Sequence, residues 1–258
     1  MISVFLQGGL GNQLFQVAAA KSLALDLKED FAINHDICYT PNQGQKSGKY
    51  KNTFFRNIKE TIVVPNIIYK EPEYSYNQIP KVKNISIQGY FQSEKYFINN
   101  KETIINDFTL GKEFFDEIHI WKDKNKITKT TVGVHIRRGD YLKFSHHHKI
   151  NGIEYYQAAF KEFNNVSFII VSDDIQWAKE NITGNNIYYS DLNDEIKDFC
   201  LLMSCDHNIN ANSTFSWWAS YLNKNLNKKI YVPSEWYTKE ANCNIKDLIP
   251  EKWNIINT

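Results

Sequence analysis

The second half of the chain alternates short apolar runs with segments of helical composition. The apolar runs are TVGVHI (131–136), VSFIIVS (166–172), IYYS (187–190), HNINA (207–211) and KIYVP (229–233). The helical segments lie between them, at 154–163, 175–180, 194–204 and 215–222. Short buried strands that alternate with helices are typical of a parallel sheet with helices on both faces. The pattern therefore predicts an α/β domain.

The first half begins with the same pattern and then loses it. We expect a strand at 2–6, a helix at 12–27, a strand at 31–34, a strand that runs into a helix at 85–97, and a helix at 101–108. Between 36 and 80 the chain is rich in Asn, Lys, Gly and Pro, which favours loops and short elements. The polar run WKDKNKITKT (121–130) is the predicted linker, so we expect two domains, 1–122 and 123–258.

Composition excludes several classes of function. The 30 Lys and Arg residues nearly balance the 29 Asp and Glu residues, so no overall positive charge recruits nucleic acid. The N-terminus lacks a basic stretch before a long apolar run, and no run of eighteen apolar residues exists, so we expect a cytoplasmic protein without a membrane-spanning segment. The four cysteines match no zinc spacing, and the histidines at 146–148 lack suitable partners, so we expect reduced thiols and no metal.

Residues that carry chemistry collect where the predicted strands end. They lie in the runs QGGLGNQ, RRGD, SDD, SD and ANSTFS. Parallel α/β sheets bind ligands at the carboxyl ends of their strands. We therefore expect these runs to build the ligand site.

The glycine turn after the first strand has more than one interpretation. Gly9 and Gly11 begin a dinucleotide fingerprint, and Asp36 follows the second strand as a ribose-binding acid would, so a nucleotide-dependent oxidoreductase stays open. Leu14 stands where that fingerprint has its third glycine, which counts against this enzyme class. The turn equally lets the amides of Gly11 and Asn12 approach an anion or a sugar hydroxyl, and a plain strand-to-helix turn is the remaining alternative.

In HIRRGD, strand alternation gives the two arginines different directions. His135 and Arg137 share one side of the strand, and Arg138 takes the other. A guanidinium pairs bidentately with phosphate, so an arginine at this edge supplies local positive charge for a pyrophosphate leaving group. Asp140, past the glycine turn, orients an arginine or accepts a proton from an attacking hydroxyl. A surface ion-pair cluster is the alternative.

Two further runs supply carboxylates and hydroxyls. Asp173 and Asp174 are candidates to bind the ribose, the base or a divalent ion, and Asp174 alternatively caps the next helix. A divalent ion is redundant if the arginines already offset the charge of the diphosphate. Ser213, Thr214 and Ser216 open a helix whose amides and hydroxyls suit phosphate oxygens, with a simple N-cap as the alternative for Ser213. Together with the arginines, this helix start predicts a diphosphate site.

The chain resembles the bacterial α-1,2-fucosyltransferases of glycosyltransferase family 11 in five segments that occur in the same order. These are GGLGNQLFQ, GYFQSEKYF, HIRRGDYL, FIIVSDD and DFCLLMSCDHNINANSTFSWWASYL. The resemblance implies a GT-B type α/β fold, two Rossmann-like domains facing a central cleft, with 1–122 on the acceptor side and 123–258 binding the donor. It also implies metal-independent, inverting transfer of L-fucose from GDP-fucose to the 2-hydroxyl of a galactose-containing, often lipid-linked glycan, at the inner membrane face.

The resemblance also implies roles for single residues. Arg137 is similar to the diphosphate-binding arginine, with Arg138 and His135 in support. Asp198 is similar to an acid that accepts from the guanine edge, and Asn12 to an amide residue that approaches fucose or the β-phosphate. The remaining residues of the donor segments are Gly9, Gly11, Asp173, Ser213, Thr214, Phe215 and Ser216, and Asp140 is our choice of base. A non-catalytic glycan-binding protein, suggested by the 14% aromatic content, is a third hypothesis.

Overall fold

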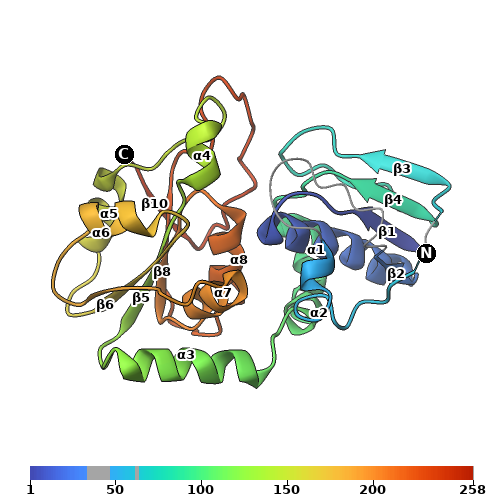
Figure 1. Ribbon diagram of the computed structural model, residues 1–258. Helices are drawn as coiled ribbons and strands as arrows, with labels where there is room; N and C mark the ends of the chain where they lie inside the picture. Colours follow the sequence, from blue (N-terminus) through green and yellow to red (C-terminus); the bar gives the residue numbers. More distant parts are fainter. Residues whose placement is uncertain (34–46, 62–63, 258) are drawn as a thin grey trace. The chain divides into compact units, whose positions relative to one another are not determined.

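The structure is a computed structural model, and it describes residues 1–33, 47–61 and 64–257. The chain divides into two compact units (Figure 1). Unit 1 comprises Met1–Leu110 and Cys243–Glu251, and unit 2 comprises Gly111–Asn242 and Lys252–Thr258. Each unit contains one parallel sheet.

The sheet of unit 1 has the strand order β2-β1-β4-β3. Its strands are β1 (Ile2–Phe5), β2 (Phe31–Ala32), β3 (Ile67–Lys70) and β4 (Ile85–Gln88), and all of their pairings are parallel. The central strands β1 and β4 are largely buried, because neighbouring strands flank both of them and α1 (Leu10–Leu27) packs against β1. The edge strand β3 is mostly exposed.

Short elements complete unit 1. Within the described residues of unit 1 these are the 3-10 turns η2 (Ser47–Tyr50), η3 (Glu94–Tyr96) and η4 (Ile98–Asn100) and the helix α2 (Lys101–Asp107). Aromatic pairs join them to the rest of the unit, with 6.4 Å between the ring centroids of Phe15 and Phe97 and 6.4 Å between those of Phe55 and Phe108. The prediction that the strand at 85 runs into a helix is wrong, since β4 leads into the 3-10 turns η3 and η4 before α2 begins.

The sheet of unit 2 has the strand order β10-β9-β8-β5-β6-β7, again with parallel pairings throughout. Its strands are β5 (Thr131–Ile136), β6 (Ser167–Ser172), β7 (Ile187–Tyr189), β8 (His207–Ile209), β9 (Ile230–Pro233) and β10 (Asn254–Ile256). Every residue of β5 is buried. The alternating pattern of the sequence predicted β5 to β9, and this prediction is confirmed.

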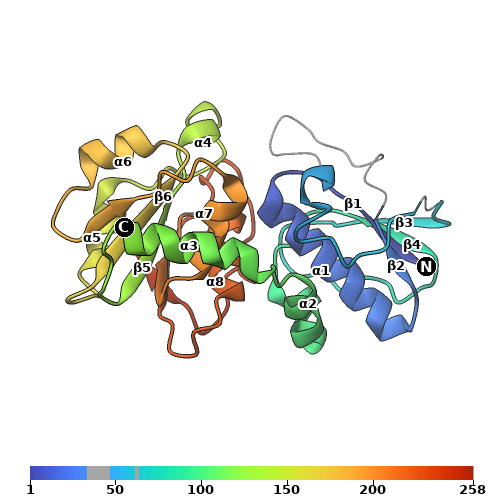
Figure 2. The ribbon, with the colours of Figure 1, turned by 60° about the horizontal axis from the view of Figure 1, so that its bottom comes forward.

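Helices cover both faces of the unit 2 sheet, with α5 and α6 on one side and α7 and α8 on the other (Figures 1 and 2). The helices of this unit are α3 (Lys112–Lys124), α4 (Gly139–Lys143), α5 (Ile153–Phe160), α6 (Ile175–Asn181), α7 (Glu195–Met203) and α8 (Thr214–Leu222). Val132 and Val134 face a core shared with Tyr155 of α5, whereas Gly133 between them lies against Leu202 of α7. Each β5 residue thus meets one helix layer.

The predicted linker at 121–130 and the predicted boundary between 122 and 123 differ from the structure. The chain first passes from unit 1 to unit 2 between Leu110 and Gly111. Residues 121–124 form the last turn of α3, which belongs to unit 2. The run looked like a linker because it is polar, but Trp121 donates from Nε1 to Asp191 Oδ1 at 2.6 Å, and Lys122 bonds to the Ser204 carbonyl at 2.8 Å. These contacts fix the helix to unit 2.

Three expectations of the sequence concern thiols, the membrane and the ribose-binding acid. Cys200, Cys205 and Cys243 are free thiols. Within 1–33, 47–61 and 64–257, none of the helices combines the length and the apolar composition needed to cross a membrane. Asp36 and Cys38 lie outside the described residues.

Candidate active site

The register of the unit 2 sheet aligns the carboxyl ends of β5 and β6. Ile136 of β5 pairs with Ser172 of β6 in a parallel ladder, so the next residues, Arg137 and Asp173, leave the two strands side by side. Figure 1 shows α4 following the end of β5 at this edge. Most of the predicted site residues of unit 2 gather there.

Arg137 lies between two carboxylates. Its Nη2 is 2.7 Å from Asp140 Oδ1, and its Nη1 is 3.2 Å from Asp173 Oδ2. The guanidinium also faces the Tyr141 ring, 5.4 Å from the centroid. Burial lowers the pKa of Arg137, but Asp173, Tyr141 and Asp140 outweigh burial and leave the pKa above its ordinary value. The side chain therefore stays charged while 32% of it remains exposed.

Arg138 points to the opposite face of the sheet, as strand alternation predicts. Its guanidinium lies over the Trp177 ring of α6, 4.1 Å from the centroid, and its Nε is 3.2 Å from Asp174 Oδ2. His135, in contrast, packs against Phe215 of α8, with 5.3 Å between ring centroids. Arg138 thus braces the strand end against α6.

The two aspartates of the SDD run are engaged by the protein itself. Asp173 Oδ1 accepts the backbone N–H of Arg138 at 2.8 Å, while its Oδ2 pairs with Arg137. Asp174 is the N-cap of α6, where its Oδ1 accepts the N–H of Trp177 at 3.2 Å. Capping, which the sequence left open, is thus a role of Asp174. Asp173 holds the arginine turn, where the sequence predicted a nucleotide contact.

Gly139 lies against the carboxylate of Asp173. It is the first residue of α4, and a Cβ at this position would lie 2.7 Å from Asp173 Oδ2 and 3.1 Å from Asp173 Cγ. Its φ lies outside the left-handed region. A side chain at this position would therefore displace the Asp173 carboxylate, and the backbone itself is not a turn that only glycine can make.

His135 is a buried neutral imidazole. Its side chain is 4% exposed, and burial, followed by the charge of Arg137, lowers its pKa to about 3. Its Nδ1 is buried without a hydrogen-bond partner in the described part of the chain. At neutral pH the ring therefore adds no second positive charge beside Arg137.

Two stacked rings lie next to Arg137, and the sequence did not predict them. Tyr141 of α4 stacks on His148, with 4.0 Å between ring centroids and 6° between ring planes, and its hydroxyl donates to the Asn212 carbonyl at 3.0 Å. Burial lowers the pKa of His148 to about 4, so this ring is also neutral at neutral pH. The stack depends on the antiparallel bridge between His148 and Tyr237, which no local sequence pattern indicates.

The start of α8 supplies fewer donors than the sequence predicted. Ser216 is fully buried, and its hydroxyl donates to the Ser213 carbonyl at 3.2 Å and the Ala211 carbonyl at 3.5 Å. Its hydroxyl faces the core in this structure, so its predicted contact with phosphate stays a prediction. Ser213 occupies the N-cap position without a capping bond from its side chain. Thr214 and Phe215 begin the helix, whose leading N–H groups have no acceptor within the helix.

Asn212 joins three segments at the end of β8. Its Nδ2 donates to the carbonyls of Lys149 and Trp236, both at 2.7 Å, and its Oδ1 accepts from Asn151 at 3.1 Å. The side chain is buried. The sequence placed Asn212 in the ANSTFS run but could not show which carbonyls it meets, because both lie far along the chain.

Asp198 belongs to the same edge of the sheet. It lies on α7 and accepts a hydrogen bond from the hydroxyl of Ser190, the residue that follows β7. Burial raises the pKa of Asp198 to about 6. The carboxyl group is therefore mostly ionised at neutral pH and mostly protonated below pH 5.

The glycine turn with Gly9, Gly11 and Asn12 belongs to unit 1. Gly8 has a φ of 77°, Gly9 is the N-cap of α1, and Gly11 and Asn12 lie in the first helical turn. Asn12 Oδ1 accepts from Gln92 Nε2 at 3.0 Å. The predicted residues of unit 2 thus lie in one cluster, whereas Gly9, Gly11 and Asn12 belong to unit 1.

A family model described as Glycosyl transferase family 11 matches residues 49–257, which is most of the chain. The chain belongs to glycosyltransferase family 11. This membership sets aside the nucleotide-dependent oxidoreductase that the glycine turn had left open. The missing third glycine at Leu14, which lies buried in α1, agrees with that outcome.

Proteins related to this family 11 chain include sugar transferases of bacteria and mammals. An alpha-1,2-colitosyltransferase of Escherichia coli is 30% identical over 293 aligned residues, which cover 96% of this chain and 96% of that protein. Galactoside alpha-(1,2)-fucosyltransferase 1 of Bos taurus is 30% identical over 168 residues, 58% of this chain and 46% of that protein. The crystal structure of NodZ alpha-1,6-fucosyltransferase co-crystallized with GDP matches with a TM-score of 0.55 at 13% identity, covering 84% of this chain and 91% of that one. The fold is α/β of the GT-B type.

The arginine cluster of this family 11 enzyme carries no excess positive charge. Two arginines meet three aspartates, so the local positive charge expected from the sequence is offset within the cluster. The ion pairs instead fix the direction of Arg137, and because a guanidinium has five N–H donors, several stay available to a ligand. In the described part of the chain, no three His, Cys, Asp or Glu side chains are grouped as metal ligands.

Proposed function

We propose that this family 11 enzyme transfers L-fucose from GDP-fucose to the 2-hydroxyl of a galactose-containing glycan, with inversion and without a metal ion. Family membership supports sugar transfer. The names of the relatives support an α-1,2 linkage and a galactoside acceptor, and the NodZ structure with GDP supports a guanosine diphosphate donor.

The observation that carries the proposal is the placement of Arg137. Two carboxylates hold its guanidinium at the carboxyl edge of the sheet, and Tyr141 connects it to Asn212, just before α8 begins. Departure of GDP builds negative charge on the β-phosphate. A charged guanidinium that is already oriented, together with a helix N-terminus, stabilises that charge in the transition state.

We propose two roles for Asp140: it orients Arg137, and it is the base that accepts a proton from the acceptor. Its Oδ1 is 2.7 Å from Arg137 Nη2, which leaves Oδ2 as the carboxylate oxygen that would accept a proton from the galactose hydroxyl. Glycosyl transfer proceeds through an oxocarbenium-like transition state, in which stabilisation of the leaving group lowers the barrier strongly. A weak base is therefore sufficient in this scheme.

Replacement of Arg137 tests the proposal. Arg137→Ala is expected to lower kcat/KM for GDP-fucose by about 10²–10³-fold, the usual effect of removing a donor to a developing oxyanion. Arg137→Lys keeps the charge without the planar fork and is expected to recover only part of the loss. The assay measures GDP release with galactose-terminated acceptors, followed by linkage analysis of the product.

The control for this test is Arg56→Ala in unit 1. Arg56 bonds to backbone carbonyls of Thr53 and Thr109, so its loss is expected to affect stability and not transfer. Near-normal transfer by a folded Arg137→Ala variant would contradict the assignment of the donor site.

A second donor is favoured by one comparison. The E. coli relative that aligns with 96% of this chain is named a colitosyltransferase, and colitose differs from fucose by the absence of the 3-hydroxyl. A site that hydrogen-bonds this hydroxyl rejects a sugar without it by about 10⁴–10⁵-fold, whereas an apolar site discriminates weakly. The ratio of kcat/KM for the two nucleotide sugars therefore decides the donor.

Metal independence is supported by the contacts of the SDD run. Asp173 and Asp174 are both engaged by arginines, and Asp174 also caps α6. Transfer is expected to persist in excess chelator. Complete loss of activity in chelator, with recovery on adding Mg²⁺ or Mn²⁺, would overturn this part of the proposal.

A further inference from the structure

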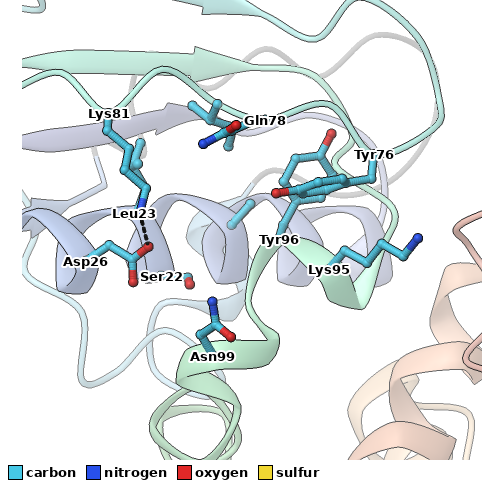
Figure 3. A pocket seen from close by; sticks show the side chains of 11 residues that line it. Ser22, Leu23, Asp26, Tyr76, Gln78, Lys81, Lys95, Tyr96 and Asn99 are labelled. Atoms are coloured by element: carbon cyan, nitrogen blue, oxygen red, sulfur yellow. Dashed lines mark hydrogen bonds and ion pairs between the residues drawn. The ribbon is translucent and has the colours of Figure 1, made fainter.

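Unit 1 contains a pocket that the proposed donor site does not use. Its volume is about 230 Å³, and it lies beside the C-terminal half of α1, where the segment between β3 and β4 and the turns η3 and η4 enclose it (Figure 3). All of its lining residues belong to unit 1.

The pocket combines an apolar floor with an aromatic wall. Leu23 of α1 and Ile79 form part of the floor, and both are buried. Tyr76 packs against Tyr96 at 4.8 Å between ring centroids, and 37% of Tyr76 is exposed (Figure 3). A hydrogen bond fixes the position of the Tyr96 ring, since the Tyr96 hydroxyl accepts the N–H of Asn77 at 3.0 Å. The pocket therefore has a fixed aromatic pair with one accessible ring.

The rim of the pocket is polar but balanced in charge. Asp26 and Lys81 form an ion pair at 3.2 Å, and Lys95 pairs with Asp247 at 2.6 Å. The side-chain amides of Gln78 and Asn99 are exposed at the rim (Figure 3). The pocket thus offers amide donors and acceptors without a net charge.

The charge balance and the size of the pocket disfavour several classes of ligand. A phosphate is disfavoured, because both lysines are paired and the nearby C-terminal end of α1 carries the negative end of the helix dipole. A lipid chain is disfavoured by the ion pair and the amides. The volume is below the ~300–1,000 Å³ of sites that enclose drug-sized molecules, so an extended ligand would place only one unit inside.

We propose that this pocket binds one neutral sugar ring of the acceptor glycan. A pyranose has an apolar C–H face that fits against a tyrosine ring and hydroxyls that pair with carboxylate and amide groups. The inference rests on the proposed function, because it concerns the acceptor of the same transfer reaction.

The pocket is a remote subsite and does not hold the reacting galactose. Ser22 lies in the pocket, and Asn12 lies in the first turn of the same helix, ten residues earlier. At a rise of 1.5 Å per residue this separates them by about 15 Å. The sugar in the pocket is therefore several linkages away from any sugar at the glycine turn, and only long acceptors reach both places.

The test compares a long acceptor with a short one. Tyr76→Ala and Asn99→Ala are each expected to raise KM for a galactose-terminated hexasaccharide by about threefold to tenfold, the usual effect of one lost hydrogen bond or ring contact. KM for the terminal disaccharide and kcat for both acceptors are expected to stay unchanged. Tyr76→Phe keeps the ring and is expected to retain most of the affinity.

The matched control is Asn106→Ala, an exposed asparagine of α2 outside the pocket, which is expected to change neither KM. Thermal melting of each variant verifies folding. Equal KM values for wild type and both pocket variants with the hexasaccharide would overturn the subsite, and so would equal losses with both acceptors. Failure of the wild type to transfer fucose to either acceptor would instead refute the proposed function, and saturation-transfer NMR of the hexasaccharide would then still test binding at Tyr76.

Discussion

Gly139→Ala tests whether Asp173 must stay in place to orient Arg137. The new Cβ would lie 2.7 Å from Asp173 Oδ2, whereas a carbon–oxygen contact normally begins near ~3.3 Å, so the carboxylate has to move by roughly 0.6 Å. The same oxygen pairs with Arg137 Nη1 at 3.2 Å, and the other carboxylate oxygen accepts the Arg138 N–H at 2.8 Å. The movement therefore weakens both contacts without changing any charge.

The expected loss is bounded by the strength of one hydrogen bond to a charged group, here the bond from the Arg138 N–H to Asp173 Oδ1, next to the weakened ion pair with Arg137. Such a bond contributes about 1.5–3 kcal/mol, and partial exposure of Arg137 and Asp173 reduces this to about 1–2 kcal/mol. Because 1.36 kcal/mol corresponds to a factor of ten in rate, kcat/KM for GDP-fucose is expected to fall about fivefold to thirtyfold. Alanine is also favoured over glycine within a helix by about 0.5–1 kcal/mol, so the loss of folding free energy is smaller than the loss of transition-state stabilisation.

The assay for this variant measures kcat/KM by GDP release and the free energy of unfolding in urea. Gly48→Ala is the matched control, because a Cβ at Gly48 meets nothing within 4 Å. It is expected to retain full activity. A Gly139→Ala enzyme with wild-type kcat/KM would refute the reasoning, since Asp173 would then be shown either to move without consequence or to contribute nothing through Arg137.

Two further predictions concern the end of β8 and the pH dependence of donor binding. Asn212→Ala leaves the carbonyls of Lys149 and Trp236 without their buried donor and is expected to lower the free energy of unfolding by about 2–4 kcal/mol, measured in urea. Burial raises the pKa of Asp198 to about 6, so its charged form, which the family resemblance predicts to accept from the guanine edge, is present above pH 6 and lost as the pH falls through that value. Affinity for GDP is therefore expected to weaken about tenfold from pH 7 to pH 5, and calorimetry on Asp198→Asn is expected to show weak binding with no such pH dependence.

Much of the unit 2 fold could be predicted from the sequence, because buried parallel strands form short apolar runs. The run at 131–136 has the same bounds as β5, and its alternation correctly placed His135 and Arg138 on opposite faces. β10 was missed, since Asn254–Ile256 is largely exposed and pairs with β9 from more than twenty residues away. α3 was missed because its polar end resembles a linker until the partners of Trp121 are known.

The candidate site was predictable in its residues but not in their contacts. The sequence shows that Ser216 is near the start of a helix, but not that its hydroxyl faces the core and bonds to backbone carbonyls. It shows His148 in a histidine triplet, but not the bridge to Tyr237 that stacks this ring on Tyr141. Contacts of this kind depend on the pairing of distant segments.

The ion pairs of the site follow from the parallel register itself. Ile136 is opposite Ser172, so the next two positions place Arg137 beside Asp173 and Arg138 beside Asp174. Each arginine meets the aspartate that leaves the neighbouring strand on the same face. Since these pairs already offset the arginine charges, attraction of a diphosphate cannot come from a surplus of positive charge at this edge. In our proposal it comes from the remaining N–H donors of Arg137 and the dipole of α8, both of which act only at short range and on a correctly placed phosphate.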